Sequence, residues 1–390
     1  MFLAEHNISA KDFPDYIAII GGGRWARVML EIICNLVPSS VKISVHSSRN
    51  AQGMKSWVLA KNLGRRITVH SDYPKAVYKK VGAVIVVNEA SDHHKAIKWA
   101  LMELIPVLVE KPVTLSYEMT RSLVDLAETK KTHLSTAHVF LFANYIKVFS
   151  KIVSNENRIE SIRVLWADSK SESRHGEIKS YDYGLPIYAD CLPHILSILE
   201  TFFKEPQKIC ENLDFFKGGS HIQINMSFDE IPCEIELIRN NNSRQRIIEV
   251  NTKDSKLTLD FTCEPGTIYK DDEILFNNFN WDDESRPIYQ MLSAFLTGVA
   301  HDDYDKFLDN SFGLIANQII DQIAIQYSAK LVHWLNSELI KNHGEIKSDL
   351  KYALTEMLHI KNIKSNETIE SRIEFIYNQL KEDILIHDHD

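Results

Sequence analysis

The sequence predicts an α/β protein with an N-terminal parallel sheet, a C-terminal α+β domain on a mostly antiparallel sheet, and a helical C-terminal extension. Over residues 16–140, apolar strand-like runs alternate with helix-like stretches, which is the pattern of a parallel sheet. Beyond residue 160, runs with a period of two follow one another with short turns, which indicates antiparallel strands. A chain of 390 residues that is 44% hydrophobic can form two domains and an appendage.

The first predicted strand, residues 16–20, leads through glycines into a predicted helix over 24–36. The spacing Gly21-x-Gly23-x-x-Ala26 is typical of a dinucleotide-binding turn. Gly21 permits a tight turn, Gly23 lets the backbone touch a pyrophosphate, and Ala26 allows close packing of helix on strand. Free N–H groups at the start of the helix favour phosphate. The expected cofactor contacts are Gly21, Gly23, Arg24, Trp25 and Ala26, and the alternative is an ordinary strand–turn–helix.

The end of the second predicted strand, residues 41–46, bears on which cofactor binds. A site for NAD carries an acidic residue about 20 positions beyond the glycines, where it holds the ribose 2′-hydroxyl. Here the chain runs His46-Ser47-Ser48-Arg49 and offers no carboxylate. Hydroxyls and a guanidinium suit a 2′-phosphate, so Ser47, Ser48 and Arg49 favour NADP over NAD. The alternative is that Arg49 is a solvated loop residue.

Two continuous apolar runs, residues 83–87 and 106–109, are predicted strands with both faces buried. A loop is expected over 88–93, at the carboxyl end of the first run, where doubly wound sheets bind ligands. The second run ends in Glu110-Lys111-Pro112. The proline favours an extended backbone at Lys111, whose amine can then hydrogen-bond a substrate oxygen or the nicotinamide ribose. The alternative is a surface lysine before a proline that starts a helix.

A third candidate site lies on a helix within the strand-rich half. Apolar residues at helical spacing run from Leu192 to Leu199, and Pro193 is tolerated only in a first helical turn, so the helix is expected to begin near Asp190. Asp190 and His194 then lie on one face, one turn apart. They can act as an acid/base unit in which His194 exchanges a proton and Asp190 orients it. The alternative is a helix cap and an ordinary histidine.

Composition excludes several classes of protein. A formal charge of −9 argues against a nucleic-acid surface, and no apolar stretch reaches membrane-spanning length. The N-terminus lacks the pattern of a secretory signal. The 5 cysteines are scattered, which is typical of free thiols in a reducing compartment. We therefore expect a cytoplasmic protein with a small-molecule substrate, no metal, and neither nucleic acid nor membrane as a partner.

Three parts of the chain are expected: a dinucleotide-binding domain over 1–140, a substrate and oligomerisation domain over 141–335, and a helical extension over 336–390. Further elements expected in the first domain are helices at 51–64, 95–102 and 113–130, a helix start at 71–74, and strands at 67–69 and 134–139. Those expected in the second are strands at 162–166, 221–226, 233–238, 246–250 and 256–259, and a helix over 312–335 that packs back on the first domain.

The extension carries two apolar stripes, from Leu350 to Leu358 and from Ile369 to Ile384, which predict two amphipathic helices. Each stripe needs a surface to cover it. We expect both to dock on the chain's own surface or on a neighbouring subunit. The alternative is a docking site for another enzyme.

Taken together, the glycine turn, Glu110-Lys111-Pro112 and Asp190-x-x-x-His194 resemble the Gfo/Idh/MocA oxidoreductases, the family of glucose–fructose oxidoreductase and inositol dehydrogenase. The similarity includes Val107 to Val113, His93 with Ala100-Leu101, and Arg286 to Phe295, and it covers roughly residues 16–335. The resemblance implies an N-terminal Rossmann domain and a C-terminal domain on an open, mainly antiparallel sheet. It also implies a homo-oligomer, a dimer or tetramer, with contacts through that sheet.

The same resemblance implies a role for each site residue. Lys111 would contact the substrate oxygen and the cofactor, His194 would donate or accept the proton, and Asp190 would support His194. Asn88 and His93 would line the nicotinamide side of the pocket, with Glu110 among the cofactor contacts. The implied reaction is reversible hydride transfer between nicotinamide, in NADP or NAD, and a carbon bearing oxygen on a sugar, polyol or nucleotide sugar.

Two departures from the family pattern put an ordinary free sugar in doubt. Relatives carry an arginine, or an asparagine and an arginine, after the strand near 135–139, whereas residues 140–145 offer only Asn144. The glycine pair that relatives carry before the D-x-x-x-H motif is replaced by Gly184-Leu185. The expected substrate contacts are Asn144, Trp166, Arg174, His175 and Tyr183.

Two other functions stay open at this point. One is a reductase of an imine or carbonyl on a non-sugar metabolite, with Lys111 and His194 as acids. The other is a dinucleotide sensor without enzymatic activity. The presence of Lys111, Asp190 and His194 together favours an enzyme.

Overall fold

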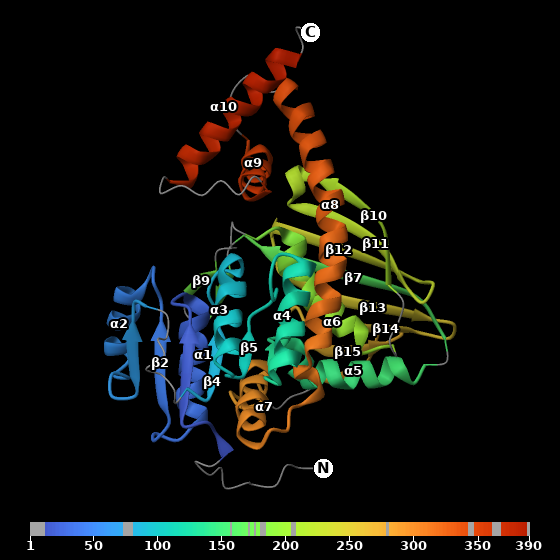
Figure 1. Ribbon diagram of the computed structural model, residues 1–390. Coiled ribbons are helices and arrows are strands. Elements are labelled where there is room, and N and C mark those ends of the chain that lie inside the picture. Colours follow the sequence, from blue (N-terminus) through green and yellow to red (C-terminus); the bar gives the residue numbers. More distant parts are fainter. Residues whose placement is uncertain are drawn as a thin grey trace. The chain divides into compact units, whose positions relative to one another are not determined.

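The computed structural model describes residues 12–72, 81–156, 158–170, 172–174, 177–179, 185–203, 208–277, 281–341, 347–360 and 368–387. The chain divides into two compact units, each assembled from two segments: unit 1 is residues 1–147 and 280–318, and unit 2 is residues 148–279 and 319–390. Figure 1 follows the chain by colour from one unit to the other and back. Within the described part of the chain, no helix has the length and apolar character needed to cross a bilayer.

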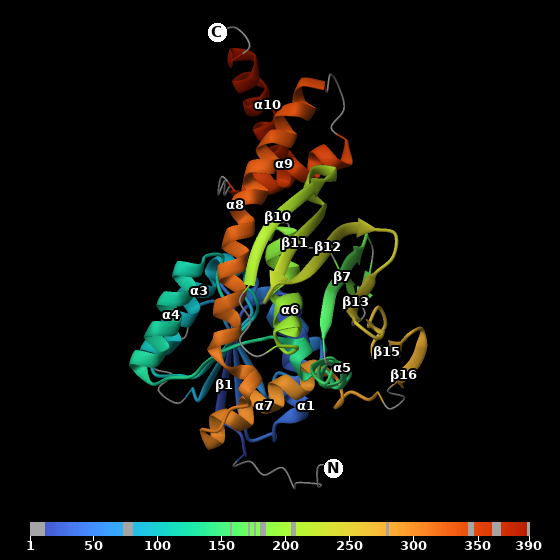
Figure 2. The same cartoon turned by 90° about the vertical axis from the view of Figure 1, so that its right-hand side faces the viewer.

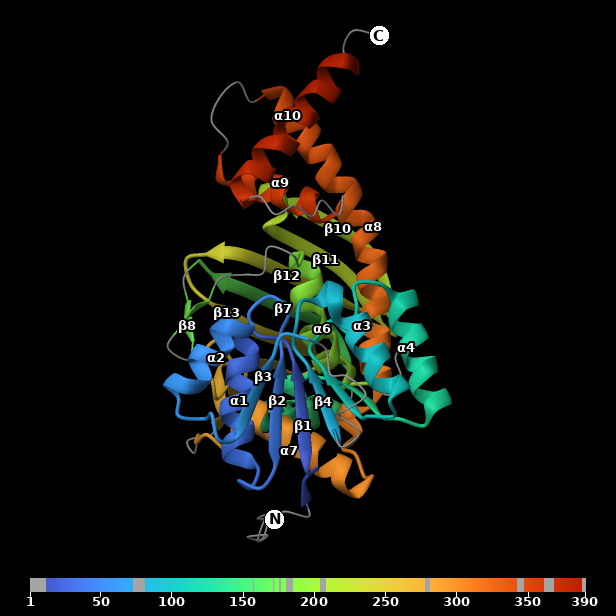
Figure 3. The ribbon, with the colours of Figure 1, turned by 60° about the vertical axis from the view of Figure 1, so that its left-hand side comes forward.

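Unit 1 is built on a six-stranded sheet in which every neighbouring pair is parallel. The strands are β1 (Tyr16–Ile20), β2 (Lys42–His46), β3 (Ile67–His70), β4 (Ala83–Val86), β5 (Val107–Val109) and β6 (Leu134–Thr136). Their order is β3-β2-β1-β4-β5-β6, and Figure 3 shows β3, β2, β1 and β4 side by side. This confirms the predicted parallel sheet. The order reverses direction between β1 and β4, which is where a doubly wound sheet binds its ligand.

Helices cover both faces of this sheet, which explains its continuous apolar strands. Side chains of β1 alternate: Ile17 and Ile19 share a core with α1 (Arg24–Leu36), α2 (Ala51–Ala60) and α7 (Pro287–His301). Ala18 and Ile20 share a second core with α3 (Ala90–Met102) and α4 (Tyr117–Lys130). A strand buried on both faces cannot alternate apolar and polar residues.

Several boundaries in unit 1 differ from those predicted. The expected loop over 88–93 is wrong, because α3 begins at Ala90 with Glu89 as its N-cap and Asp92 in its first turn, where the helix dipole favours a carboxylate. The strand predicted over 134–139 ends at Thr136 and gives way to the 3₁₀ helix η3 (Val139–Phe142). A second short 3₁₀ helix, η5 (Lys306–Leu308), follows α7. Residues 73 and 74 of the helix start expected at 71–74 lie outside the described residues.

Unit 2 is built on an eight-stranded sheet in the order β10-β11-β12-β7-β13-β14-β15-β16 (Figures 1 and 2). Its strands are β7 (Ile159–Ser169), β10 (Lys208–Phe216), β11 (His221–Phe228), β12 (Ile231–Asn241), β13 (Gln245–Thr252), β14 (Lys256–Asp260), β15 (Thr267–Lys270) and β16 (Glu273–Asn277). Only β12 and β7 are parallel among these pairs, so the sheet is mainly antiparallel, as predicted. A separate hairpin, β8 (Glu172–Arg174) with β9 (Glu177–Lys179), was not predicted.

The two faces of this sheet differ in chemistry. One face buries an apolar row that includes Val164, Ile235 and Ile248. The other presents Arg163, whose guanidinium lies 3.2 Å from the Glu234 carboxylate, within a group of surface ion pairs. The alternation of apolar and charged residues that predicted these strands therefore marks the two faces correctly.

The helix α6 (Ile187–Glu200) begins earlier than the sequence predicted. Pro186 is its N-cap, and Pro193 lies inside the helix rather than in its first turn. The expectation that the helix begins near Asp190 was therefore wrong. Burying the apolar side chains of Ile187 and Tyr188 stabilises the earlier start of the helix. This gain exceeds the cost of the one backbone hydrogen bond that Pro193 cannot donate. Asp190 still lies in the first turn, with its N–H donating to the Pro186 carbonyl oxygen at 3.0 Å.

In the described residues of the C-terminal part lie α8 (Asn310–Lys341), α9 (Ser348–Ile360) and α10 (Ile369–His387). Much of the apolar stripes predicted in the extension is buried: Leu350, Leu354 and Ile376 are each at most 2% exposed, whereas Ile369 and Leu380 are half-buried. A glycine turn makes room for them: Gly218 has φ +65°, and a Cβ built there would lie 2.3 Å from the Asp349 carbonyl oxygen of α9. These facts favour docking on the chain's own surface.

The neighbouring Gly219 provides a test of this packing. Its φ is +93°, and a Cβ there would lie 2.2 Å from the Tyr327 hydroxyl of α8. We expect Gly219→Ala to lower the free energy of unfolding by at least about 2 kcal/mol, through backbone strain and overpacking. The matched control is Gly64→Ala, at an exposed site with 3.7 Å to the nearest atom, and should cost less than about 0.5 kcal/mol. Denaturant unfolding measures both, and equal losses would contradict the close contact.

Candidate functional site

The glycine turn after β1 lies at the point where the strand order of unit 1 reverses. Gly21 has φ +142°, and a Cβ built on it would lie 2.7 Å from the Val87 carbonyl group that follows β4. Only glycine fits this approach. Gly23 is different, because it is exposed and no heavy atom of the described residues lies within 4 Å of a Cβ built there. The turn is thus tight against the sheet at Gly21 and open at Gly23.

The start of α1 has the character of an anion site. Gly23 is its N-cap and offers no side-chain oxygen to the first N–H groups, which is the arrangement that favours phosphate. The Arg24 guanidinium lies 5.4 Å from the centroid of the Trp25 ring, and Ala26 is fully buried against the sheet. These residues fit the pyrophosphate of a dinucleotide, in the positions that the sequence predicts.

Lys111 follows β5 at the same edge of the sheet. The N–H of Val87 donates to Ile20 at 2.8 Å, and the N–H of Glu110 donates to Val86 at 2.9 Å, so the ends of β1, β4 and β5 are adjacent. Lys111 is half-buried, and its backbone N–H donates to the Glu110 carboxylate at 3.0 Å. The glycine turn, Asn88 and Lys111 therefore lie along one edge of unit 1.

His93 connects two of these segments. One ring nitrogen lies 2.9 Å from the Pro112 carbonyl oxygen, and the other lies 3.0 Å from the Asn88 carbonyl oxygen. The ring is 1% exposed, and burial lowers the pKa of His93, which the two carbonyl contacts partly oppose. His93 thus links the segment after β4 to the segment after β5 through these two carbonyl groups. Its ring is not presented to solvent.

The end of β2 carries the residues expected to choose the cofactor. Ser47 is buried beneath the glycine turn, and its hydroxyl accepts a hydrogen bond from the Asn50 N–H at 3.1 Å. Ser48 is exposed. The Arg49 guanidinium forms ion pairs with Glu89 and, at 3.1 Å, with Asp92, and the hydrogen bond to Glu89 raises the pKa of Arg49.

His46 occupies the last position of β2. Its ring nitrogens lie 3.0 Å from the Ser44 hydroxyl and 2.8 Å from the Asp72 carbonyl oxygen, and its ring stacks on His70. Burial lowers the pKa of His46 to about 4, so the imidazole is neutral at pH 7. A neutral ring therefore stands where a site for NAD would carry a carboxylate.

In unit 2, the first turns of α6 face two buried arginines. Asp190 is 25% exposed, and its Oδ2 lies 3.3 Å from Nη2 of Arg239 in β12, whose side chain is 1% exposed. His194 is half-buried and stacks on Trp166 of β7, with ring centroids 5.9 Å apart. The Arg246 guanidinium lies 4.0 Å from the centroid of the same Trp166 ring. A carboxylate, an imidazole and two cations thus meet on one side of α6.

Comparison with known proteins agrees with the geometry of unit 1. Residues 16–138 match the family model described as an oxidoreductase family with an NAD-binding Rossmann fold. This segment resembles the NAD-binding Rossmann domain of the Gfo/Idh/MocA oxidoreductases. No curated protein matches the sequence significantly.

Solved structures with the same fold include several dehydrogenases. GenD2 of gentamicin A biosynthesis, in complex with NAD, is 15% identical with a TM-score of 0.67, and the match covers 84% of this chain and 97% of GenD2. UDP-N-acetylglucosamine 3-dehydrogenase GnnA from Acidithiobacillus ferrooxidans is 15% identical, with a TM-score of 0.63 over 80% and 97%. The myo-inositol dehydrogenase from Lactobacillus casei is 14% identical, with a TM-score of 0.62 over 77% and 91%. At these identities the likeness shows the fold alone.

The expected substrate contacts are distributed over both units. Asn144 is exposed at the start of α5 (Asn144–Ser154) in unit 1. Trp166 is only 4% exposed and is enclosed by His194, Arg246 and Phe261, so it supports His194. Arg174 ends β8 in unit 2, and His175 and Tyr183 lie outside the described residues. The structure therefore groups the glycine turn, Asn88, His93 and Lys111 in one unit, and Trp166, Asp190 and His194 in the other.

Arg239 and Arg246 were not predicted as site residues, although the sequence contains a signal for both. Arg239 continues the buried positions of β12 in steps of two from Ile235, and Arg246 occupies the buried phase of β13 with Ile248. A guanidinium at an apolar position of an alternating strand needs a carboxylate partner. Asp168 provides it for Arg246, and Asp190 for Arg239.

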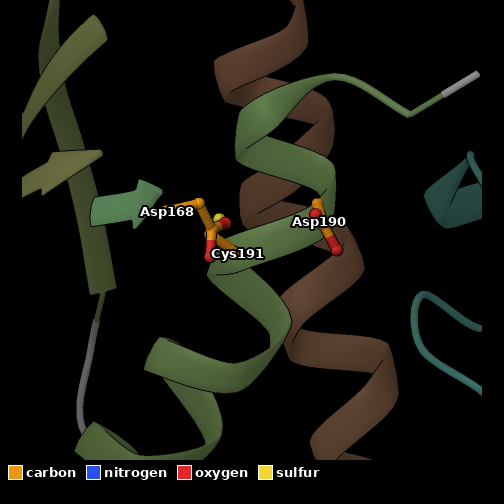
Figure 4. A group of neighbouring side chains, drawn as sticks. All are labelled: Asp168, Asp190 and Cys191. Atoms are coloured by element: carbon orange, nitrogen blue, oxygen red, sulfur yellow. The ribbon is translucent and has the colours of Figure 1, made fainter. Parts of the chain in front are cut away.

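The same carboxylates form a cluster with the geometry of a metal site. Ligand atoms of Asp168, Asp190 and Cys191 all lie within 4.8 Å of one another (Figure 4). Both carboxylates, however, have an arginine partner, and burial raises the pKa of Cys191 to about 12, so its thiol stays protonated. Ion pairing accounts for the cluster, and we assign no metal to it.

The open space at Gly23 leads to a prediction about cofactor binding. We expect Gly23→Ala to leave the thermal unfolding of the protein unchanged, because its methyl group meets no atom of the described residues. We expect it to weaken binding of reduced nicotinamide nucleotides by at least about tenfold, because the methyl stands where the pyrophosphate approaches. Fluorescence titration and thermal unfolding measure the two effects. Gly21→Ala is the contrasting variant and should unfold more readily. Wild-type affinity in Gly23→Ala would place the nucleotide elsewhere.

Proposed function

We propose that the protein is an NAD(P)-dependent oxidoreductase that transfers a hydride between nicotinamide and a carbon bearing a hydroxyl or carbonyl group. The proposed substrate is a sugar, a polyol or a sugar-like metabolite. The names of structurally similar proteins support this class, because they act on UDP-N-acetylglucosamine, myo-inositol and levoglucosan. The proposal includes a homo-oligomer in the cytoplasm, and the division into residues 1–140, 141–335 and 336–390.

One observation carries the proposal: the glycine turn, open at Gly23, lies on the same sheet edge as Lys111. A turn that accepts a pyrophosphate, next to a lysine on a neighbouring strand end, is the arrangement that a dinucleotide-dependent enzyme needs. A sensor requires the turn but has no use for the lysine. The Asp190–His194 pair in unit 2 supplies the acid/base chemistry that the reaction also requires.

Each residue has a proposed role. Nicotinamide, when bound, supplies or accepts the hydride. Gly21, Gly23 and the N–H groups that begin α1 hold the pyrophosphate. The Lys111 amine donates a hydrogen bond to the reacting oxygen of the substrate and places it. His194 accepts the proton of the hydroxyl during oxidation and returns it during reduction, and Asp190 orients the imidazole.

The activity is tested by following absorbance at 340 nm. Sugars, polyols and nucleotide sugars are offered with NAD⁺ and NADP⁺, and carbonyl compounds and imines with NADH and NADPH. On a substrate found this way, Lys111→Met and His194→Gln should each lower kcat by about 100-fold or more, because each removes a group that handles the reacting oxygen or its proton. Lys130→Met and His221→Gln, at sites away from these groups, are the controls.

Three results would contradict parts of this proposal. Reduction of imines alone would favour the imine reductase. Nucleotide binding without turnover across the whole panel would favour the sensor. Full activity in both Lys111→Met and His194→Gln would refute their assignment.

The proposed preference for NADP depends on Arg49. No carboxylate is present in residues 46–49, but Arg49 is paired with Glu89 and Asp92, both on or beside α3. Two carboxylates around one guanidinium leave a net negative charge, which opposes a 2′-phosphate. NADP must therefore take Arg49 from these partners, and the strength of the ion pairs sets the preference.

Neutralising the two acids should release Arg49. We expect Glu89→Gln/Asp92→Asn to increase the affinity for NADPH relative to NADH by about tenfold, and Arg49→Ala to decrease it. Arg121→Ala breaks the exposed ion pair with Asp125 in the same unit and serves as the control. Dissociation constants from fluorescence titration decide the question. An unchanged ratio in both Arg49→Ala and the double variant would remove Arg49 from the cofactor site.

A further inference from the structure

Arg239 is the most thoroughly buried cation next to the proposed acid/base pair. Its position in β12 belongs to the apolar phase of the strand, and its side chain is 1% exposed. Removing a guanidinium from water costs several kcal/mol unless carboxylates and hydroxyls replace the solvent. The partners of Arg239 therefore decide both its charge and its orientation.

These partners come from two directions. On one side, Nη2 lies 3.3 Å from Oδ2 of Asp190 on α6. On the other, Nη1 donates to the Tyr352 hydroxyl at 3.2 Å and lies 3.9 Å from the Glu356 carboxylate, and both residues belong to α9. Burial alone would lower the pKa of Arg239, but Tyr352, Asp190 and Glu356 together raise it well above its usual value. The guanidinium thus stays charged between α6 and α9.

The position of α9 within unit 2 is fixed by close backbone packing at Gly218 and Gly219. Gly218 and Gly219 leave no room for a Cβ against α9 and α8, and Ala353 and Leu354 of α9 are fully buried. Tyr352 and Glu356 are four residues apart and therefore lie on one face of the helix. Both are buried, at 5% and 1% exposure. Because α9 is docked in this way, the Tyr352 hydroxyl and the Glu356 carboxylate are held in place next to Arg239.

We propose that Arg239 is a positioning residue for Asp190, and that α9 of the C-terminal extension completes the acid/base site by holding Arg239 through Tyr352 and Glu356. The inference rests on the proposed function only in the roles of Asp190 and His194. It gives the extension a part in catalysis through the two residues that hold Arg239.

The expected consequence is electrostatic. Arg239 fixes the Asp190 carboxylate and offsets part of its charge, so that His194 one turn away is less strongly driven to the imidazolium form. Other charged groups around this part of α6 are Asp168 of β7 and Arg246 of β13, which pair with each other, and Glu356 of α9. Loss of the Arg239 cation should therefore raise the pKa of His194.

The test uses the full chain with the double substitution Arg239→Met/Glu356→Gln, which removes both members of a buried charge pair and leaves neither alone. The pKa of the His194 imidazole is measured by NMR of ring-labelled histidine, with the signal assigned by its loss in His194→Gln. We expect a rise of about 1 in this pKa, and a fall in kcat of about tenfold on an accepted substrate, with cofactor affinity unchanged. The matched control is Lys351→Met/Glu370→Gln, which removes an exposed ion pair between α9 and α10 and should change neither value.

The outcomes separate this inference from the proposed function. A raised His194 pKa in a protein that turns over no substrate supports the positioning network and refutes the enzyme. An unchanged pKa and kcat in an active Arg239→Met/Glu356→Gln variant refutes the network and leaves the enzyme. Should that variant fail to fold, Arg239→Lys keeps the charge without the planar fork that reaches both helices. A smaller shift in the same direction supports the proposal, and wild-type values in Arg239→Lys overturn it.

Discussion

The burial of positive charge in an apolar sheet face is the constraint on which unit 2 depends. Arg239 and Arg246 occupy buried positions of β12 and β13, where an apolar side chain would pack against the core without needing an ion-pair partner. Each must draw a carboxylate into the interior. Asp168, on β7, pairs with Arg246, and Asp190, on α6, pairs with Arg239. The Arg239–Asp190 pair thus ties α6 to the sheet, and the Arg246–Asp168 pair joins two strands within it. Arg163, on the opposite face, is half exposed, so water solvates its charge and no buried carboxylate is required.

Unit 1 depends on a related constraint, the close approach of backbone to backbone at Gly21, and this one could be predicted. The glycine spacing, the apolar runs and their order were enough to predict the parallel sheet and the turn, because each is a local pattern. The ends of α3 and β6 were not, since they depend on neighbours. His93 lies inside a helix because Glu89 and Asp92 support an earlier start, and its ring is held by carbonyl groups of two other segments. No spacing in the sequence contains that information.

The same limit applies to the cofactor. Residues 46–49 indicated a positive charge for a 2′-phosphate, but the carboxylates that surround Arg49 come from the start of α3, more than thirty positions along the chain. In unit 2, β10 was missed because its apolar pattern breaks at a bulge between Cys210 and Asn212. The buried arginines could have been found, because the strands that carry them were predicted and their apolar phase was known.

The energetics of the Arg239 network argue for a role beyond stability. Exchanging a buried ion pair for apolar residues of similar volume is often neutral or stabilising by about 1–4 kcal/mol. Arg239 therefore does not explain the stability of unit 2, in which the apolar face and the docked helices already bury a large core. One carboxylate satisfies at most part of the five donors of a guanidinium. A second acidic group is needed on the far side, and α9 is the element that supplies it. An arginine held from both sides has one orientation, and that orientation aims Nη2 at Asp190.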